Sequence, residues 1–269
     1  MTTKEGGSRS RAGAEDPAWL RDILELRGRS KGGRLLLEGL RLNTGAREAR
    51  VPFEQVLYAP EFYCDDACAR LVGDLERGGV VSRRLAPETF SRVSYKAEGV
   101  LGVVRAPKPT LDEVLRAPRA IVLDGLSDPG NIGAILRTMN AWGAGWACAV
   151  VDGADKLYHP KALRASMGAI FHTPTCATDR AVAVAAVARL GRRVVVLSPD
   201  GTVGLDDLPL DGVVFVLGNE RRGVHEAWRD VTTSRVAIPI GGAIDSLNVA
   251  TAAAIILWEA FRREDRRRA

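Results

Sequence analysis

Three loops in the second half of the chain carry residues that can bind a ligand. Each loop comes directly after a short apolar run, and each combines glycine with amide, carboxyl or guanidinium side chains. The apolar runs are residues 120–123, 213–217 and 236–238, and the polar residues after them are Asn131, Arg137, Asn219, Glu220, Ser246 and Asn248. Because ligands of open parallel sheets bind beyond the carboxyl ends of the strands, this pattern predicts one ligand site built from three loops.

The first loop has the sequence of a turn that opens into a helix. Residues 128–130, Asp-Pro-Gly, have turn chemistry, and Asn131 is a candidate cap of the helix that follows. Gly130 and Gly133 leave room for a ligand to approach, but Asn131 could equally be only a cap and Arg137 only a surface charge. The glycines are not spaced as G-x-G-x-x-G, so the fingerprint of a nicotinamide-dependent dehydrogenase is missing.

The second and third loops also allow two interpretations each. Gly218 permits close approach to the amide and carboxyl residues after it, although a simple turn would have the same composition. In the third loop, Asp245 or Ser246 is the natural N-cap of a long helix. Asn248 is a poor helix former inside the first turn, so we expect another reason for its presence. The amide-rich start of this helix can also accept a negative group.

The elements around these loops alternate between strands and helices. Apolar runs predict strands at residues 120–123, 146–151, 194–197, 213–217 and 236–238. Helical patterns separate them at residues 131–142, 160–168, 181–190, 224–228 and 246–262. Continuous apolar strands between helices are typical of an α/β fold with a mostly parallel sheet that is buried on both faces.

The first half of the chain predicts a smaller α/β domain. Asp16 and Pro17 are the expected start of a helix, with Asp16 as N-cap. Short apolar runs at residues 35–37, 56–58, 80–81 and 100–104 alternate with helical stretches such as residues 66–77. We therefore divide the chain into a disordered basic lead-in (1–14), a first domain (15–105), a linker with two prolines (106–117) and a second domain (118–269).

The charge and composition are compatible with a nucleic-acid partner, but they do not exclude other classes of soluble protein. The formal net charge is +5 and the pI is about 9.2, which suits a polyanion such as RNA. The histidines are scattered and the four cysteines show no paired ligand spacing, so we expect no metal and free thiols. The N-terminus lacks the apolar run of a secretion signal, and no stretch is long enough to span a membrane. We expect a soluble, cytoplasmic protein.

Taken together, the three loops resemble the motifs of the SpoU/TrmH family of SPOUT methyltransferases. The first motif is Asn131-Ile132-Gly133 with Arg137-Thr138, and the second is Leu217-Gly218-Asn219-Glu220 with Gly223. The third is Ile238-Pro239-Ile240 followed by Ser246-Leu247-Asn248-Val249. The resemblance covers roughly residues 118–262, and residues 34–41 and 98–104 are similar to the family's RNA-binding domain.

The resemblance implies a fold, a reaction and a set of site residues. The second domain would be a SPOUT domain with a deep trefoil knot, preceded by a small α/β RNA-binding domain. The reaction would transfer a methyl group from S-adenosylmethionine to a ribose 2′-hydroxyl of RNA, most often ribosomal RNA, by a homodimer with each site near the subunit interface. The alternatives are a transfer-RNA 2′-O-methyltransferase and a catalytically inert RNA-binding or ribosome-assembly protein of the same fold. The implied catalytic residues are Asn131, Arg137, Glu220, Ser246 and Asn248, and the implied cofactor-binding residues are Leu197, Ser198, Gly218, Asn219, Ile238 and Leu247.

Two expectations about basic residues complete the prediction. Arg137 is regarded as a base in the family, but a charged guanidinium has no acceptor and a pKa above about 12. We expect it to clamp the target phosphate and to stabilise developing negative charge. The predicted RNA-binding residues are Arg27, Arg29, Lys31, Arg34, Arg41 and Arg164, although the same run could be only a solvated basic face.

Overall fold

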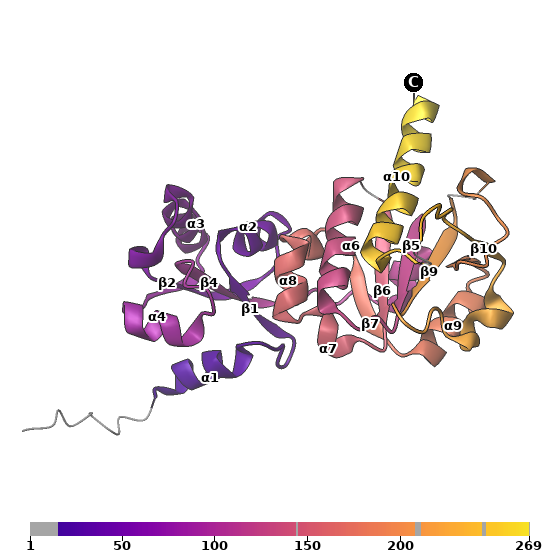
Figure 1. The fold of residues 1–269 in the computed structure, drawn as a ribbon. Coiled ribbons are helices and arrows are strands. Elements are labelled where there is room, and N and C mark those ends of the chain that lie inside the picture. Colours follow the sequence, from indigo (N-terminus) through magenta and orange to yellow (C-terminus); the bar gives the residue numbers. More distant parts are fainter. Residues whose placement is uncertain (1–15, 144, 208–210, 244–245, 269) are drawn as a thin grey trace, which may run out of the picture.

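The computed structural model describes residues 16–268 apart from 144, 208–210 and 244–245, and side chains up to residue 264. Two sheets lie side by side, the N-terminal one at the left of Figure 1 and the C-terminal one at the right. The predicted lead-in, residues 1–14, lies outside the described residues. Within the described residues, no helix is both long and apolar enough to cross a membrane, and no cluster of metal-binding side chains forms.

The N-terminal sheet has four strands in the order β1-β4-β2-β3. Its strands are β1 (Arg34–Glu38), β2 (Phe53–Tyr58), β3 (Val81–Arg84) and β4 (Val100–Arg105), and only β2 and β3 are parallel. Its helices are α1 (Ala18–Leu26), α2 (Leu40–Glu48), α3 (Asp66–Arg77) and α4 (Pro87–Val93), with a 3-10 turn η1 (Pro60–Phe62). The apolar run of β4 is buried up to Val104, as expected of an inner strand with helices on both sides.

The C-terminal sheet has six strands in the order β10-β8-β9-β5-β6-β7, and all of its pairings are parallel. Its strands are β5 (Arg119–Asp124), β6 (Trp146–Val151), β7 (Thr175–Thr178), β8 (Arg193–Leu197), β9 (Val213–Gly218) and β10 (Ser234–Val236). Every residue of β5 and β6 is buried. The predicted α/β fold with a parallel sheet is confirmed.

Helices cover both faces of this sheet (Figure 1). The long helices are α6 (Pro129–Ala141), α9 (Arg180–Arg189) and α10 (Val249–Arg268), and the shorter ones are α5 (Leu111–Arg116), α7 (Ala154–Leu157), α8 (Pro160–Ser166), η2 (Ala169–Phe171), η3 (Leu205–Asp207) and η4 (Glu226–Val231). One face packs against α6, α8 and α10 through residues such as Ile121 and Leu123. The other packs against α5, α9 and η4 through Ala120 and Val122, because side chains alternate along a strand.

The strand order places the three loops at one edge of the sheet. The chain runs from β5 through β6 to β7 on one side, and β9 and β8 lie on the other. This reversal beside β5 is the kind of switch point at which α/β sheets bind ligands. The loops after β5 and β9 start on neighbouring strands, and the loop after β10 starts at the same edge, with β8 between β10 and β9.

The two domains share a core rather than being joined by a plain linker. Leu37, Leu42 and Val104 from the first domain pack in one cluster with residues of the second. The predicted linker, residues 106–117, contains helix α5, which begins with a capping box at Thr110 and is buried at its apolar residues. We expected an extended linker because of two prolines, Pro107 and Pro109, but the helix start at Thr110 lies in the same stretch.

Several predicted element ends are wrong by a few residues. Helix α1 has Pro17 as N-cap without a side-chain cap, because the Asp16 carboxylate pairs with Arg92 at 2.8 Å instead. The predicted strand at 236–238 ends at Val236. The predicted helix at 224–228 is the 3-10 helix η4, and the predicted helix at 246–262 begins only at Val249.

Candidate functional site

A hollow of about 770 Å³ opens among the loops after β8, β9 and β10 and the start of α10. The predicted cofactor-binding residues all line it: Leu197, Ser198, Gly218, Asn219, Ile238 and Leu247. Two predicted catalytic residues, Glu220 and Ser246, line it as well. The structure thus brings residues from three separate loops to one concave surface.

Beside this hollow, a chain of hydrogen bonds joins the loop after β5 to the loop after β9 and to the start of α10. Asn248 Nδ2 donates to Asn131 Oδ1 at 3.2 Å, and Asn131 Nδ2 donates to Glu220 Oε1 at 2.8 Å. The second carboxylate oxygen of Glu220 accepts from the backbone N–H of Ser127 at 3.1 Å. Each amide therefore has a fixed orientation, and Glu220 is the acceptor at the end of the array.

The side chain of Asn219 holds the first and second loops together. Its Nδ2 donates to the Gly125 carbonyl at 2.9 Å and to Ser127 Oγ at 2.8 Å. Its Oδ1 accepts from the backbone N–H groups of Arg221 and Arg222. Both ends of the amide are engaged, and the backbone of Asn219 exchanges two hydrogen bonds with that of Gly223, so Asn219 organises the walls of the hollow.

The helix caps differ from those predicted. Asp128, not Asn131, caps α6, accepting from the Gly130 N–H at 2.7 Å. Asn248 caps α10, since its Oδ1 accepts from Ala250 and Thr251, and Ser246 lies before the helix. Asp245, the other predicted cap, lies outside the described residues. These corrections explain why Asn131 and Asn248 have amide groups available to each other.

Glu220 is held in its charged form. Burial raises the pKa of this carboxyl, but hydrogen bonds from backbone N–H groups and from Asn131 outweigh burial, so the pKa lies below its ordinary value of 4.5. A carboxylate accepts hydrogen bonds only. At neutral pH Glu220 can orient Asn131 and neighbouring groups, and it has no proton to donate.

The hollow fits S-adenosylmethionine in size and lining. Its volume lies within the roughly 300–1,000 Å³ of small-molecule pockets. A Cβ on Gly218 would collide with the backbone of Gly223, and one on Gly201 would collide with the backbone of Val236, so glycine is what lets these walls close together. Leu197, Ile238 and Leu247 offer apolar contacts in its walls beside polar residues such as Ser198 and Ser246. This combination suits an adenine ring and an amino-acid chain.

Arg137 is not brought to this hollow. It lies further along α6 and lines a second hollow of about 750 Å³ between the two domains. Its side chain is exposed and forms no hydrogen bond or ion pair with the part of the chain that the structure describes. Within one chain, Arg137 is therefore separated from the other predicted catalytic residues, which line the first hollow or are hydrogen-bonded beside it.

Sequence reasoning missed the buried carboxylate beneath the loops. Asp124, the last residue of β5, is 2% exposed and accepts from Arg180 Nε and from the backbone N–H of His225, both at 2.8 Å. It ties the loop after β9 to the start of α9. An acidic residue at the end of an otherwise apolar strand was the available signal.

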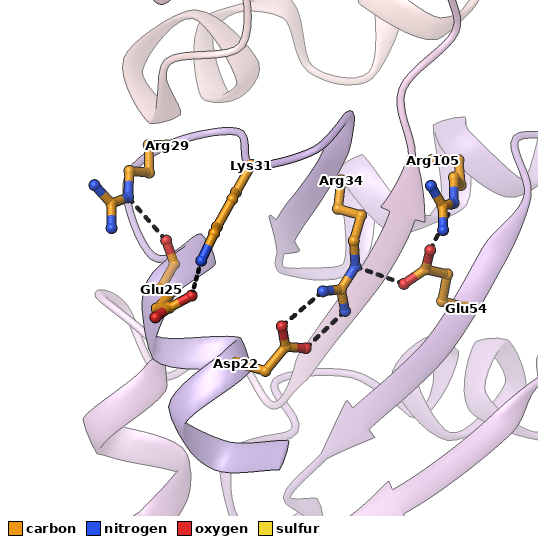
Figure 2. Close-up of polar contacts among 7 residues, drawn as sticks. All are labelled: Asp22, Glu25, Arg29, Lys31, Arg34, Glu54 and Arg105. Atoms are coloured by element: carbon orange, nitrogen blue, oxygen red, sulfur yellow. Dashed lines mark hydrogen bonds and ion pairs between the residues drawn. The ribbon is translucent and has the colours of Figure 1, made fainter. Parts of the chain in front are cut away.

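The predicted RNA-binding residues fall into two groups. The Arg34 guanidinium donates to the Asp22 carboxylate at 2.7 and 2.8 Å and to the Glu54 carboxylate at 2.6 Å (Figure 2). Lys31 pairs with the Glu25 carboxylate, and Arg29 donates to the Glu25 backbone carbonyl at 3.0 Å (Figure 2). Arg34 therefore has its guanidinium occupied inside the domain, whereas Lys31 and Arg29 stay at the surface.

The second group consists of Arg27, Arg41 and Arg164, and none of their guanidinium groups forms an ion pair with the described residues. Arg27 lies over the ring of Tyr95, with 4.1 Å from its central carbon to the ring centroid, and Tyr95 is 55% exposed. Arg41 and Arg164 are exposed, and neither forms a hydrogen bond or ion pair with the described residues. Burial raises the pKa of Glu38, and the positive charges of Arg164 and Arg27 oppose that rise.

Comparison with known proteins places the chain in a family. The sequence model of the SpoU rRNA Methylase family matches residues 118–258, more than half of the chain. The chain therefore belongs to the SpoU rRNA methylase family. The matched segment contains all three loops of the first hollow and helix α6.

Two relatives and one solved structure align with most of the chain. A 23S rRNA (uridine(2479)-2′-O)-methyltransferase from Streptomyces viridochromogenes is 29% identical over 87% of this chain and 85% of its own length. A 23S rRNA (adenosine(1067)-2′-O)-methyltransferase from Streptomyces laurentii is 32% identical over 72% and 74%. The crystal structure of the SpoU methyltransferase AviRb from Streptomyces viridochromogenes with the cofactor AdoMet has a TM-score of 0.78 and 28% identity, covering 93% of this chain and 98% of that one.

Proposed function

We propose that this chain transfers a methyl group from S-adenosylmethionine to a ribose 2′-hydroxyl of ribosomal RNA. The observation that carries the proposal is the hydrogen-bonded array of Asn248, Asn131 and Glu220 at the rim of a hollow with the size and lining for the cofactor. Relatives with similar coverage are 2′-O-methyltransferases of 23S rRNA by name, which favours ribosomal over transfer RNA. We also propose that the protein acts on this RNA in the cytoplasm.

The chain's own residues position the reacting groups. When bound, S-adenosylmethionine would supply an electrophilic methyl group and would leave as S-adenosylhomocysteine, while the ribose hydroxyl would lose its proton to solvent as the new O–C bond forms. Leu197, Ile238 and Leu247 hold the cofactor by apolar contact, and the Gly218 segment offers backbone groups. The Asn131–Glu220 pair keeps the rim polar and fixed at the place where the ribose enters. Such positioning alone can supply about 7–11 kcal/mol in well-aligned cases.

Arg137 acts on the RNA phosphate and on developing negative charge in this proposal. Guanidinium binds phosphate with two parallel hydrogen bonds, and Arg137 has no internal partner among the described residues. Because it lies in a different hollow from Ser246 and Glu220, we propose that it completes the site of a second subunit. This division gives the homodimer a direct catalytic purpose.

An aromatic cluster supports the homodimer. Trp142 directly follows α6, and Trp258 and Phe261 lie on α10. The ring centroids of the three are 4.9–5.9 Å apart, and Trp258 is 46% exposed. Aromatic side chains are enriched in subunit interfaces. We propose that this face of α6 and α10 contacts a second copy of the chain, close to Arg137.

The chain path around the cofactor hollow supports a trefoil knot. The segment after β8 lies against strand β10, with Ser198 N–H donating to the Val236 carbonyl at 3.0 Å and Val203 N–H to the Arg235 carbonyl at 3.1 Å. Gly201 has no room for a Cβ at this crossing. We propose that these crossings belong to the knot of the SPOUT fold and that they make the hollow rigid.

The first domain is the RNA-binding domain in this proposal. The exposed ring of Tyr95 beneath Arg27 is a stacking platform of the type that binds unpaired bases. Arg29 and Lys31 follow Arg27 along the chain and can contact phosphates near this platform. Arg34, with its guanidinium held by Asp22 and Glu54, supports the fold of the domain rather than the RNA.

The test is methyl transfer from labelled S-adenosylmethionine to two separate RNA pools. Purified protein is incubated with deproteinised ribosomal RNA and, in parallel, with total transfer RNA. The proposal predicts label in ribosomal RNA at a rate well above that in transfer RNA. Label in transfer RNA alone would move the substrate to the other pool, and cofactor binding without transfer to either would indicate an inert binder.

A further inference from the structure

The second hollow lies between the two domains and belongs to neither alone. Its walls come from α2 and α3 on one side and from α6 and η2 on the other. The charged residues that line it are Arg41, Arg47, Glu48, Arg70, Asp74 and Arg137. It is thus a hollow of about 750 Å³ with charged side chains in its walls, comparable in size to the cofactor hollow.

Positive charge is unevenly compensated in this hollow. Arg47 pairs with Asp74 at 2.7 Å. Arg70 has a side chain that is 70% exposed and reaches the Asp65 carboxylate at only 3.9 Å. Arg41 and Arg137 have no hydrogen bond or ion pair to any residue that the structure describes. Three guanidinium groups from α2, α3 and α6 are therefore available to one anionic ligand.

The hollow is preformed because the two domains meet closely at its base. A Cβ on Gly45 would lie 3.0 Å from Gly168 Cα, so the two backbones are in direct contact. Met167 and Gly168 both have positive φ, at 54° and 94°, which turns the chain sharply at this point. The distance between Arg41 and Arg137 is consequently fixed by backbone packing rather than by a flexible linker.

We propose that this hollow is a phosphate-binding cradle for the RNA strand that carries the target nucleotide. Arg41 and Arg70 of the first domain hold backbone phosphates of the strand, and Arg137 of the second domain engages the phosphate nearest the target ribose. The inference rests on the proposed function and extends it, because it assigns Arg70 and the junction between the domains to substrate binding. Arginine suits this purpose through its paired N–H donors.

A second copy of the chain is the competing occupant. The aromatic cluster on α6 and α10 offers a better protein contact, since it is apolar and partly exposed. The hollow offers charged side chains, which are depleted at the centres of protein interfaces. The geometry therefore favours a polyanion in the hollow and a subunit on the neighbouring face.

The experiment compares Arg41→Gln, Arg70→Gln and the double variant with the matched control Arg116→Gln. Arg116 is 65% exposed on α5 and has only a 3.8 Å pair with Asp112, so its replacement removes the same charge elsewhere. Affinity for deproteinised 23S rRNA is measured by filter binding across a series of salt concentrations. Steady-state kinetics give KM for RNA, KM for S-adenosylmethionine and kcat.

Each cradle variant is expected to weaken RNA binding about tenfold. The slope of log affinity against log salt should fall by roughly 0.7–0.9 for each phosphate that the variant no longer binds. KM for RNA should rise with little change in kcat or in KM for the cofactor, and Arg116→Gln should match the wild type. The double variant should show about the sum of the two slope changes.

Two results would overturn the cradle. If wild type methylates ribosomal RNA and the Arg41 and Arg70 variants behave like Arg116→Gln, the hollow does not bind the substrate, and the proposed function stands. If the variants instead change the molar mass measured by light scattering, the hollow is a protein contact. Failure of the wild type itself to methylate either RNA pool would refute the proposed function, and the cradle with it.

Discussion

Three amide side chains and one carboxylate connect the loops of the cofactor hollow. Asn219 joins the loops after β5 and β9, and Asn131, Glu220 and Asn248 join these to the start of α10. Each amide forms at least one hydrogen bond to a different loop. Removing one member of such an array costs free energy, because a buried or partly buried polar group that loses its hydrogen-bond partner is no longer compensated for its desolvation.

Replacing Asn131 by Asp tests this array. The variant keeps the shape of the side chain but removes the donor to Glu220 and places two carboxylates together. Loss of a hydrogen bond to a charged group amounts to about 1.5–3 kcal/mol, so kcat for RNA methylation should fall about tenfold or more. The measurement is steady-state kinetics with 23S rRNA, with cofactor affinity followed by calorimetry.

The double variant Asn131→Asp with Glu220→Gln is the matched control. It reverses the direction of the bond, since the introduced amide can donate to the introduced carboxylate while its oxygen still accepts from the Ser127 N–H. We expect it to recover a large part of the activity that Asn131→Asp removes. Equal activity of the single and double variants would show that the bond does not matter.

The lowered pKa of Glu220 also leads us to predict that the stability of the protein depends on pH. Its pKa is lowered in the folded protein from an ordinary value of 4.5, so its contribution to stability is complete above pH 4.5 and is lost as the pH falls through the lower folded value. Glu220→Gln should therefore lower the melting temperature at pH 7, and the difference from wild type should shrink below about pH 4.5. Thermal unfolding followed by circular dichroism at both pH values measures this, and a difference that grows in acid would contradict the assignment.

Helix packing around α6 sets where its polar residues lie. Gly133 faces α8 so closely that a Cβ would lie 2.8 Å from Ala165 Cβ and would collide with the Ala162 carbonyl. Asn131 is held at the start of the same helix by the Asp128 cap. The glycine of the first motif is therefore a packing residue, in addition to any role in letting a ligand approach.

Gly133→Ala should destabilise the protein by about 1–3 kcal/mol, because overpacking forces two helices apart. Gly73→Ala is the control: it lies inside α3, has no positive φ, and its Cβ would meet only the flexible end of Arg77 at 3.3 Å. Alanine should raise the stability there by a few tenths to about 1 kcal/mol. Urea denaturation compares the two, and equal effects would argue against tight packing at Gly133.

Much of the element order could be predicted from the sequence, because apolar runs mark buried strands. The ends could not, since they depend on contacts between distant segments. Asp16 is drawn to Arg92 instead of capping α1, and Asn131 is freed for Glu220 because Asp128 caps α6. The position of Arg137 in a separate hollow likewise follows from the packing of two domains, which no local pattern contains.

The basic residues show the same limit. Arg34 and Arg27 are equally basic in the sequence, yet one is held by two carboxylates and the other lies over an exposed tyrosine. This difference between Arg34 and Arg27 depends on the fold of the first domain and cannot be seen in the sequence. The assignment of Arg34 to RNA contact remains a prediction that its internal partners argue against.

The molecule as a whole is built so that one chain does not gather the full predicted catalytic set. We expect Trp258→Glu to convert the proposed homodimer to a monomer, since a charge would enter the aromatic cluster formed by Trp142, Trp258 and Phe261. The monomer should bind S-adenosylmethionine but lose RNA methylation by at least tenfold. Light scattering measures the molar mass, and Val182→Glu, at another exposed apolar residue, controls for added charge. A fully active monomer would show that Arg137 serves its own chain.

The most direct measurement identifies the atom that receives the methyl group. Ribosomal RNA labelled by the wild-type protein from tritiated S-adenosylmethionine is digested to nucleosides and separated by chromatography. A polar array that presents a ribose to the cofactor predicts label in a single 2′-O-methylnucleoside. Label in a base-methylated nucleoside, or a lack of label despite bound cofactor, would contradict the proposed function of this site.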